Sequence, residues 1–391
     1  MIKNKGLVRY EWKKVKILAF ALLCCGLIAW LALDVKMEQM RNNYESDFQE
    51  IFNPVDAYGP YNDHFISFNG LLSNSYNTSE RGSIFGIAFY SSLYMTTMFF
   101  VLGAFLLAAV EFAEEKLPSG EDFLYSLPVT RKMLIKNRIR FSLLTLGAAF
   151  GLYSLGVLLV QHRNANWINK LNLTTGYFKE FSANENMRTT AAALLLCFLV
   201  IVTVYFICLL FQTMSNSMPV AAAVSFLVFW FPLFLGNTIN NLCIRFGGFV
   251  FPLYEKVINK LMNPTKFFAW DCTHITDSAS QKYIAFWSLT DMVPKFLMLI
   301  ILIVVCWALS RLFYEKTYAS SEGIFRKKWL NRAFQLIFSV SCGLFVTRVY
   351  NSGRYGFWPL MCGVVLVSLC IYACLNRFIG MGRRRKENGK I

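Results

Sequence analysis

The sequence predicts an all-α, polytopic membrane protein with about eight transmembrane helices, and three observations point to that class. Of the 391 residues, 56% are hydrophobic and only 16% are charged, whereas a soluble globular chain is nearer to about 25% charged. Apolar runs of about twenty residues, the length that a helix needs to cross a bilayer, recur along the chain. Polar connections separate these runs, and basic residues gather in alternate connections.

The distribution of charge predicts the orientation in the membrane. The formal net charge is +16, and the segments expected inside the cell hold 24 Lys and Arg against 9 Asp and Glu. The segments expected outside hold 15 against 14, so the excess follows the positive-inside pattern. A nucleic-acid-binding protein would instead collect basic residues on one soluble face. We therefore expect a multi-pass protein of the cell membrane, with both termini in the cytoplasm, the lipid bilayer as a partner and no nucleic-acid partner.

The chain begins with a basic segment and a first span. Residues 1–16 are basic with apolar side chains interleaved, which predicts an amphipathic elbow at the membrane surface, and the same residues also serve as a basic flank that sets orientation. The span covers about 17–33. No small-residue cleavage site clearly follows it, so we expect a retained anchor rather than a signal peptide. Residues 34–83 form an acidic loop that we place outside.

Spans two and three follow at about 84–110 and 141–160. Span three contains Gly147 and Gly151, a spacing that lets two membrane helices approach closely.

The connection between these spans, residues 111–140, is too polar to cross a bilayer and lies at the base of both spans. Pro118 and Gly120 break the preceding helix, and Ser119 is placed to cap a new one. A short helix over 119–127 would carry its apolar side chains on one side: Phe123, Leu124 and Leu127. Pro128 ends this helix, and Thr130 is placed to cap a second helix that begins at Arg131. A helix this short needs a surface to dock on; an ordinary charged connector is the alternative interpretation.

The second half of the chain continues with loops and spans. Residues 161–189 are expected outside, and spans four and five, about 190–214 and 219–236, are joined by a tight inside turn. Residues 237–287 form an apolar outside loop with short interfacial helices, in which Cys243 and Cys272 are the only cysteine pair available for a bridge.

Span six, about 288–309, completes a six-span core over 17–309. A basic cytoplasmic connector over 310–332 leads to two additional spans within 333–376, and a basic cytoplasmic tail over 377–391 is expected to be disordered.

The connection over 111–140 resembles the first cytoplasmic loop of bacterial permeases of type 2 ABC exporters, the ABC-2 class. The resemblance rests on Glu111, Gly120, Asp122, Leu124, Lys136 and the run from Ser126 to Arg131. Thr130 stands where that family often has Ser. A second, partial likeness, to a segment found after span six in a longer subgroup, involves Tyr314, Lys316, Glu322 and Gly323.

The resemblance implies a permease subunit with a cytoplasmic coupling helix seated in a separate ABC ATPase, so that ATP binds to the partner and this chain carries no cofactor. It also implies a second permease copy or paralogue, and transport in the export direction. Phe123, Leu124 and Leu127 would be the buried anchors of the docking helix, with Glu121 and Arg131 at its rim. Glu111, at the base of span two, would pair with a basic residue of the ATPase or the elbow.

Three common sequence motifs of nucleotide-binding and hydrolytic enzymes are absent from the chain. It contains no G-x-x-x-x-G-K-[ST] loop, no H-E-x-x-H and no G-x-S-x-G sequence, so we expect no catalytic residue and no metal site. The middles of the spans contain no Asp, Glu, Lys, Arg or His, although ion-coupled transporters usually keep such residues there. This pattern favours a transporter whose energy does not come from ion coupling within its own spans, and an apolar or amphipathic substrate. The alternative is a membrane-embedded sensor or accessory protein without a transport path.

Overall fold

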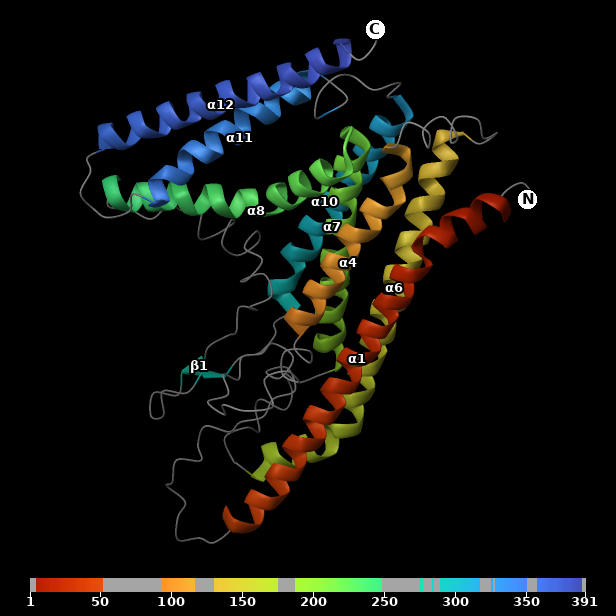
Figure 1. Ribbon diagram of the computed structural model, residues 1–391. Helices are drawn as coiled ribbons and strands as arrows, with labels where there is room; N and C mark the ends of the chain where they lie inside the picture. The colour runs from red at the N-terminus through yellow and green to blue at the C-terminus, as the bar shows by residue number, and fades with distance from the viewer. Residues whose placement is uncertain are drawn as a thin grey trace. The chain divides into compact units, whose positions relative to one another are not determined.

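A computed structural model of the chain describes residues 5–51, 93–116, 130–174, 187–247, 275–276, 283–284, 289–316, 325, 328–349 and 357–388 (Figure 1). Almost all of these residues are helical. The long helices are, in chain order, α1 (Lys5–Ile51), α4 (Leu93–Ala113), α6 (Arg131–Thr174), α7 (Met187–Met214), α8 (Met218–Leu242), α10 (Leu289–Lys316), α11 (Lys328–Val349) and α12 (Phe357–Asn388).

The remaining elements are short. A 3-10 turn, η3 (Glu114–Lys116), follows α4, and a π-helical turn, η4 (Cys243–Gly247), follows α8. Two antiparallel strands, β1 (Ile275–Thr276) and β2 (Tyr283–Ile284), pair Ile275 with Ile284 and Thr276 with Tyr283.

The described residues confirm an all-α, membrane-type fold. Six helices there are long and apolar enough to cross a membrane. They match predicted spans one, two, three, four, six and eight: Arg9–Gln39, Met95–Lys116, Arg131–Asn166, Met187–Met214, Met292–Glu315 and Trp358–Arg377. Helix α8 qualifies only as a shorter apolar helix over Met218–Val228, and α11 is not among the six.

The chain divides into two compact units. The first comprises Met1–Leu107, Lys136–Tyr205 and Phe268–Val304, and the second comprises Ala108–Ile135, Phe206–Phe267 and Val305–Ile391. Four helices, α4, α6, α7 and α10, contribute residues to both units.

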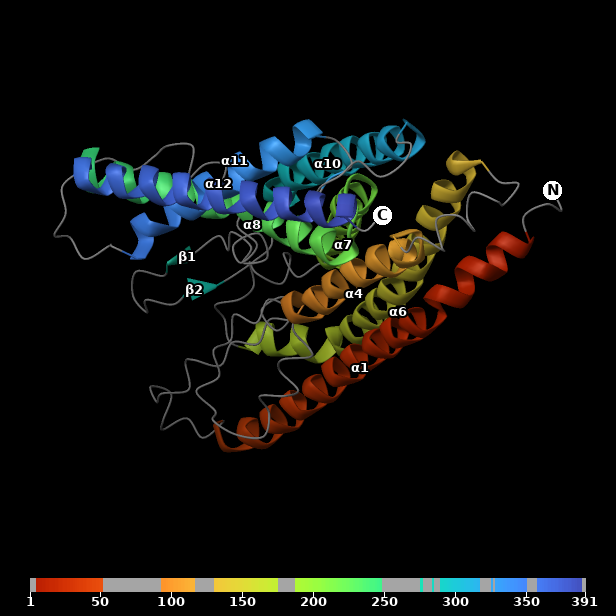
Figure 2. The same cartoon turned by 45° about the horizontal axis from the view of Figure 1, so that its top comes forward.

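In the first unit α1 and α6 lie side by side and run in the same direction (Figure 2). Their contacts advance together along both helices: Glu11 meets Arg138, Gly26 meets Ala149, Trp30 meets Gly156, and Asp34 pairs with Arg163 at 2.7 Å. Helix α4 runs the opposite way against both of them. Leu22 of α1 contacts Gly103, and Phe100 meets Phe150 of α6 edge to face at 5.2 Å. This alternation of direction is what consecutive spans require.

The close approach of α1 and α6 occurs at Gly156 and at Gly26, where a Cβ would lie 2.9 Å from the carbonyl oxygen of Ala149, and not at Gly147 or Gly151 themselves. A Cβ at Gly156 would overlap the indole of Trp30. Among the described residues a Cβ at Gly151 would meet nothing within 4 Å, and one at Gly147 only Phe198 at 3.8 Å. Gly147 and Gly151 therefore make no close helix contact among the described residues, because the spacing alone does not say which side of the helix meets a neighbour.

In the second unit α11 and α12 lie side by side as an antiparallel hairpin (Figure 1). A Cβ at Gly343 of α11 would lie 2.6 Å from the carbonyl oxygen of Val364 in α12, so glycine permits this approach. Helix α8 contacts α11 through Phe234 and Phe345, whose rings stack with centroids 6.3 Å apart. A small apolar core gathers the end of α7, the start of α8 and residue 325: Met214, Val224 and Phe325, surrounded by Leu210, Phe211, Val220, Phe313, Leu330 and Phe334.

Burial follows the pattern of lipid-exposed helices. Large apolar side chains stand outward, such as Ile17 and Phe20 of α1, 76% and 70% exposed. Polar side chains lie inward, as on α11, where Asn331, Gln335 and Ser339 form a buried line. A soluble protein arranges these classes the other way round. The exposed apolar faces therefore fit a hydrocarbon environment.

Several helices are longer than the predicted spans. We placed loops from 34 and from 161, but α1 continues to Ile51 and α6 to Thr174. No Gly or Pro occurs between 34 and 51 or between 161 and 174, so nothing local breaks either helix before Pro54 and Gly176. The tail was expected to be disordered, yet α12 extends through its basic residues to Asn388.

Candidate functional site

Residues 117–129 lie outside the described residues, and with them the predicted docking residues Glu121, Phe123, Leu124 and Leu127. The two ends of that segment are described. Arg131 is half-buried and begins α6, as predicted. The amides of Met133 and Leu134 donate to the Thr130 carbonyl oxygen at 2.9 and 3.1 Å, which fixes the first turn of the helix. Glu111, on the last turns of α4, is buried, with 1% of its surface exposed.

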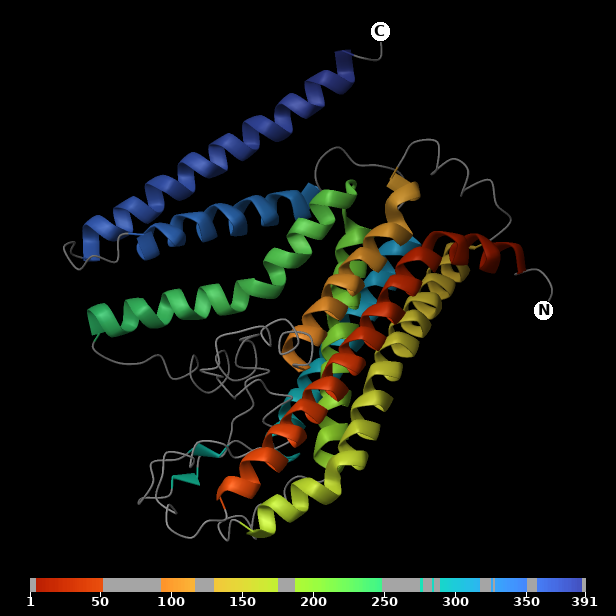
Figure 3. The same ribbon diagram turned by 60° about the horizontal axis from the view of Figure 1, so that its bottom comes forward.

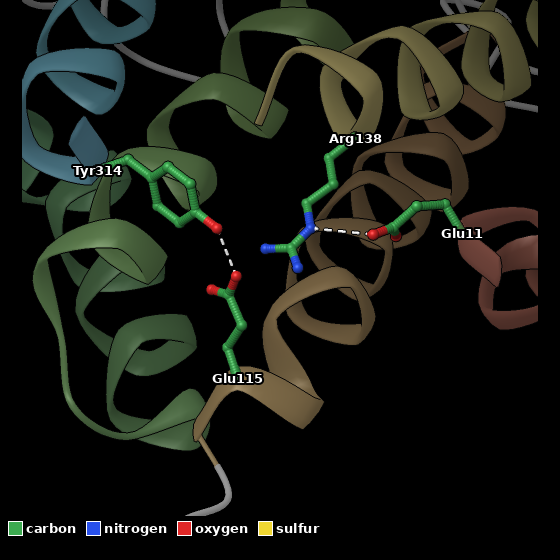
Figure 4. Close-up of polar contacts among 4 residues, drawn as sticks. All are labelled: Glu11, Glu115, Arg138 and Tyr314. Carbon is green, nitrogen blue, oxygen red and sulfur yellow. Dashed lines mark hydrogen bonds and ion pairs between the residues drawn. The ribbon is translucent and has the colours of Figure 1, made fainter. Parts of the chain in front are cut away.

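On the α4 side, η3 is tied to the end of α10. The Tyr314 hydroxyl donates a short hydrogen bond to Glu115 Oε1, and both side chains are buried (Figure 4). The ring of Phe112 meets the ring of Tyr314 edge to face at 5.9 Å. A carboxylate in an apolar setting requires such a donor, because burying it without one costs free energy. The pair therefore holds the end of α10 against the end of α4.

The next residue ties η3 to the α7–α8 turn. Lys116 Nζ donates to the Ser215 carbonyl oxygen at 3.0 Å. Ser215 also closes its own turn, since its hydroxyl accepts from the Ser217 amide at 3.2 Å and donates to the Ser217 carbonyl oxygen at 3.0 Å. Pro219 follows in the first turn of α8, where its missing N–H costs nothing. The tight turn that was predicted between 214 and 219 is confirmed.

Phe325 joins the same set of helix ends. It forms an isolated antiparallel bridge with Ser215. Its amide donates to Asn331 Oδ1 at 2.8 Å, and Asn331 Nδ2 donates back to its carbonyl oxygen at 3.0 Å. The start of α11 is thereby fixed to the α7–α8 turn.

On the α6 side, the first unit holds a buried ion pair. Arg138 Nε lies 3.4 Å from Glu11 Oε1, and the two side chains are 0% and 1% exposed (Figure 4). Arg138 stands two turns into α6 and Glu11 in the second turn of α1. Opposite charges buried together attract more strongly than in water.

These contacts join helix ends within each unit. In the second unit Glu115 and Lys116 fix the residues just before 117–129 to α10 and to the α7–α8 turn. In the first unit Arg138 fixes the helix that follows 117–129 to α1. The described residues before and after 117–129 thus make buried polar contacts, each set within its own unit.

Sequence reasoning did not assign a role to Glu11, Glu115 or the Arg138 guanidinium. Glu11 is the only acid in residues 1–16, and Glu115 follows Glu111 by one helical turn, so both carried a weak local signal. Their partners lie 127 and 199 residues away in the chain, which no local pattern indicates. Tyr314 was noted only as part of a family likeness.

The predicted cysteine pair is described only in part. Cys243 lies in η4, but Cys272 lies outside the described residues, so their pairing stays a prediction.

Comparison with known proteins found no relative: no family model, no curated protein and no solved structure matches this chain significantly.

Proposed function

We propose that the chain is the membrane-spanning permease subunit of a type 2 ABC exporter, paired with a second permease and with separate ATPase subunits. The observation that carries the proposal is the 111–140 connection, whose residues from Glu111 to Arg131 resemble the coupling loop of that family. The connection joins two helices that are apolar and long enough to cross a membrane. Buried polar contacts at Glu115 and Arg138 are the kind of support that a force-bearing loop needs.

The contacts within the second unit favour an α8 that crosses the membrane. Glu115 and Lys116 lie in η3, directly after α4, and hydrogen bonds join them to two other helix ends. Lys116 bonds to Ser215, which follows α7, and Glu115 bonds to Tyr314, near the end of α10. The three helix ends therefore belong on one side. For α10 to end on the side where α7 ends, the chain must cross the membrane an odd number of times between Ser215 and Leu289. Helix α8, with 25 residues, is roughly 37 Å long and can make that crossing.

The same reasoning gives α11 a crossing. Phe325 is bridged to Ser215, so α11 begins on the side of the α4, α7 and α10 ends. If α11 did not cross, the basic end of α12 would emerge outside, against the positive-inside pattern. The outward Leu336, Ile337 and Val340 of α11 also suit lipid. These observations support eight spans with both termini in the cytoplasm.

In the proposed mechanism, ATP closes the ATPase dimer, and the 119–127 helix moves as a rigid lever. The movement enters the membrane through α4 and α6, which flank the loop, and spans one, two and five reorient around a central path. The substrate moves without chemical change on this chain, and ATP hydrolysis stays on the partner.

The test is affinity purification of the full chain in mild detergent, with ATP hydrolysis measured in the eluate. We expect an ATPase subunit to co-purify, and Phe123→Ala or Leu124→Ala to remove it. Leu144→Ala is the matched control, because Leu144 is an outward-facing leucine on α6. A chain that purifies alone under several extraction conditions would contradict the proposal and favour a membrane sensor.

A further inference from the structure

The first turns of α1 are attached to α6 by a buried ion pair. Figure 3 shows these turns bending away from the rest of the helix. Glu11 belongs to this initial part, and its carboxylate is buried against Arg138. Lys14 lies over the ring of Tyr10, 4.1 Å from its centroid, on the same part of the helix. Lys13 is exposed.

A single line of inward residues on α1 connects this pair to the remainder of the helix. After Glu11 the line continues through apolar side chains that face the interior of the unit: Val15, Ala19, Leu22, Ala29, Leu33 and Met37. Arg138 begins the matching line on α6, with Ser142, Ala149 and Tyr153 following it. The ion pair is therefore the first link of a long parallel helix contact, at the end nearest to residue 130.

The other ion pair between these helices differs in setting. Arg163 meets Asp34 at 2.7 Å, but their side chains are 60% and 28% exposed. An exposed pair contributes little to holding two helices together. A buried pair cannot separate without leaving a charge in an apolar setting, which is strongly unfavourable. Of these two ion pairs, the Glu11–Arg138 contact is the one that resists separation in this way.

We propose that Glu11 and Arg138 are positioning residues that make the first turns of α1 follow the start of α6. A displacement that enters α6 at its start then reaches the first turns of α1 through the Glu11–Arg138 ion pair. This inference rests on the proposed function, since it needs an ATPase that moves the loop. It assigns the buried pair a role in transmission in addition to its role in packing.

The test uses two probes in the purified complex with its ATPase, reconstituted in lipid nanodiscs. An environment-sensitive fluorescent amino acid is encoded at Lys132, exposed in the first turn of α6, or at Lys13, exposed beside Glu11. Genetic encoding avoids labelling the native cysteines. The signal is the change in emission when ATP and vanadate are added. We expect both probes to respond in the otherwise unchanged chain.

The deciding variant replaces both partners with apolar side chains, Glu11→Leu with Arg138→Met. Replacing a whole buried pair is often neutral for folding, whereas removing one partner leaves an uncompensated charge. We expect the double variant to fold and to bind the ATPase, with the Lys132 response retained and the Lys13 response lost. The matched control, Asp34→Leu with Arg163→Met, should keep both responses.

The other outcomes separate the two proposals. An unchanged Lys13 response in the double variant would overturn the transmission role and leave the permease proposal intact. A silent Lys132 probe in the otherwise unchanged complex, or a chain without any ATPase, would overturn the permease proposal and this inference with it. If the double variant fails to assemble, Glu11→Gln with Arg138→Met provides the second measurement: it keeps the shape of the Glu11 side chain and leaves no uncompensated charge, and an unchanged Lys13 response there overturns the transmission role.

Discussion

Buried charged side chains in this chain occur where helices leave their apolar stretches. Glu11 and Arg138 precede the long apolar parts of α1 and α6, and Glu111 and Glu115 follow that of α4. A charge at such a place can be buried at moderate cost, because a partner on a neighbouring helix end is within reach. At the middle of a span the same charge would face hydrocarbon. Within each unit these four residues therefore fix helix ends without placing their charges at the middle of a span.

The hydroxyl of Tyr314 can be tested separately from its ring. In Tyr314→Phe the ring remains against Phe112, but Glu115 loses a hydrogen-bond donor. Loss of a partner by a buried polar group costs about 1–3 kcal/mol. We expect a lower melting temperature for the detergent-solubilised variant. Tyr372→Phe, at an exposed tyrosine of α12, should change stability by less than about 0.5 kcal/mol. Equal melting temperatures for both variants would show that the hydroxyl contact does not stabilise the fold.

At the scale of the element, short sequence patterns correctly predicted the start of one helix and the position of one turn. Thr130 and Arg131 begin α6 where capping predicted it, and the turn at Ser215 lies where the polar residues interrupt the apolar run. Helices α1 and α6 extend beyond the predicted ends of spans one and three, because a change from apolar to polar residues does not by itself end a helix. Polarity marks where a span leaves the membrane, whereas Gly and Pro mark where a helix stops.

The helix contacts could not be predicted in the same way. Gly151 had the familiar spacing but makes no close contact among the described residues, whereas Gly156 and Gly343 do. Tertiary packing decides which helices become neighbours and which faces of them meet, and a short sequence pattern does not contain that information. The Glu115–Tyr314 contact belongs to the same class, since it joins helices far apart in the chain. The position of the predicted docking loop, by contrast, followed directly from its polarity between two apolar runs.

The α11–α12 hairpin gives an element-scale prediction. Gly343→Ala places a methyl group against the Val364 carbonyl oxygen and the Ser368 hydroxyl, and overpacking of this kind costs about 1–3 kcal/mol. Alanine in a helix gains about 1 kcal/mol over glycine, so the net effect should still be destabilising. Gly363→Ala is the matched control on α12, because its methyl group would meet nothing within 4 Å among the described residues. We expect Gly343→Ala to lower the melting temperature and Gly363→Ala to leave it unchanged or raise it. The opposite order would show that the two helices do not pack closely at Gly343.

At the scale of the whole molecule, the number of membrane crossings determines on which side of the membrane each loop lies. Six crossings by α1, α4, α6, α7, α10 and α12 alone would place the end of α10 on the opposite side from the ends of α4 and α7. The hydrogen bonds of Glu115 with Tyr314 and of Lys116 with Ser215 require those ends to be together. Eight crossings satisfy them and leave the basic residues of 310–332 inside. The contacts and the charge distribution, which are independent observations, thus favour the same topology.

Cysteine labelling in intact cells distinguishes the two topologies. In a chain whose 11 native cysteines are replaced by alanine, single cysteines are introduced by Ser278→Cys, Ser320→Cys and Ser352→Cys. Eight crossings place residues 278 and 352 outside and residue 320 inside. We therefore expect a membrane-impermeant maleimide to label the first and third variants in intact cells, and Ser320→Cys only after permeabilisation. Six crossings predict the reverse for residues 278 and 320, because α10 would then run in the opposite direction. That result would also mean that the Tyr314–Glu115 contact does not form in the membrane, and Glu115, just before the predicted docking helix, would lose its contact with α10.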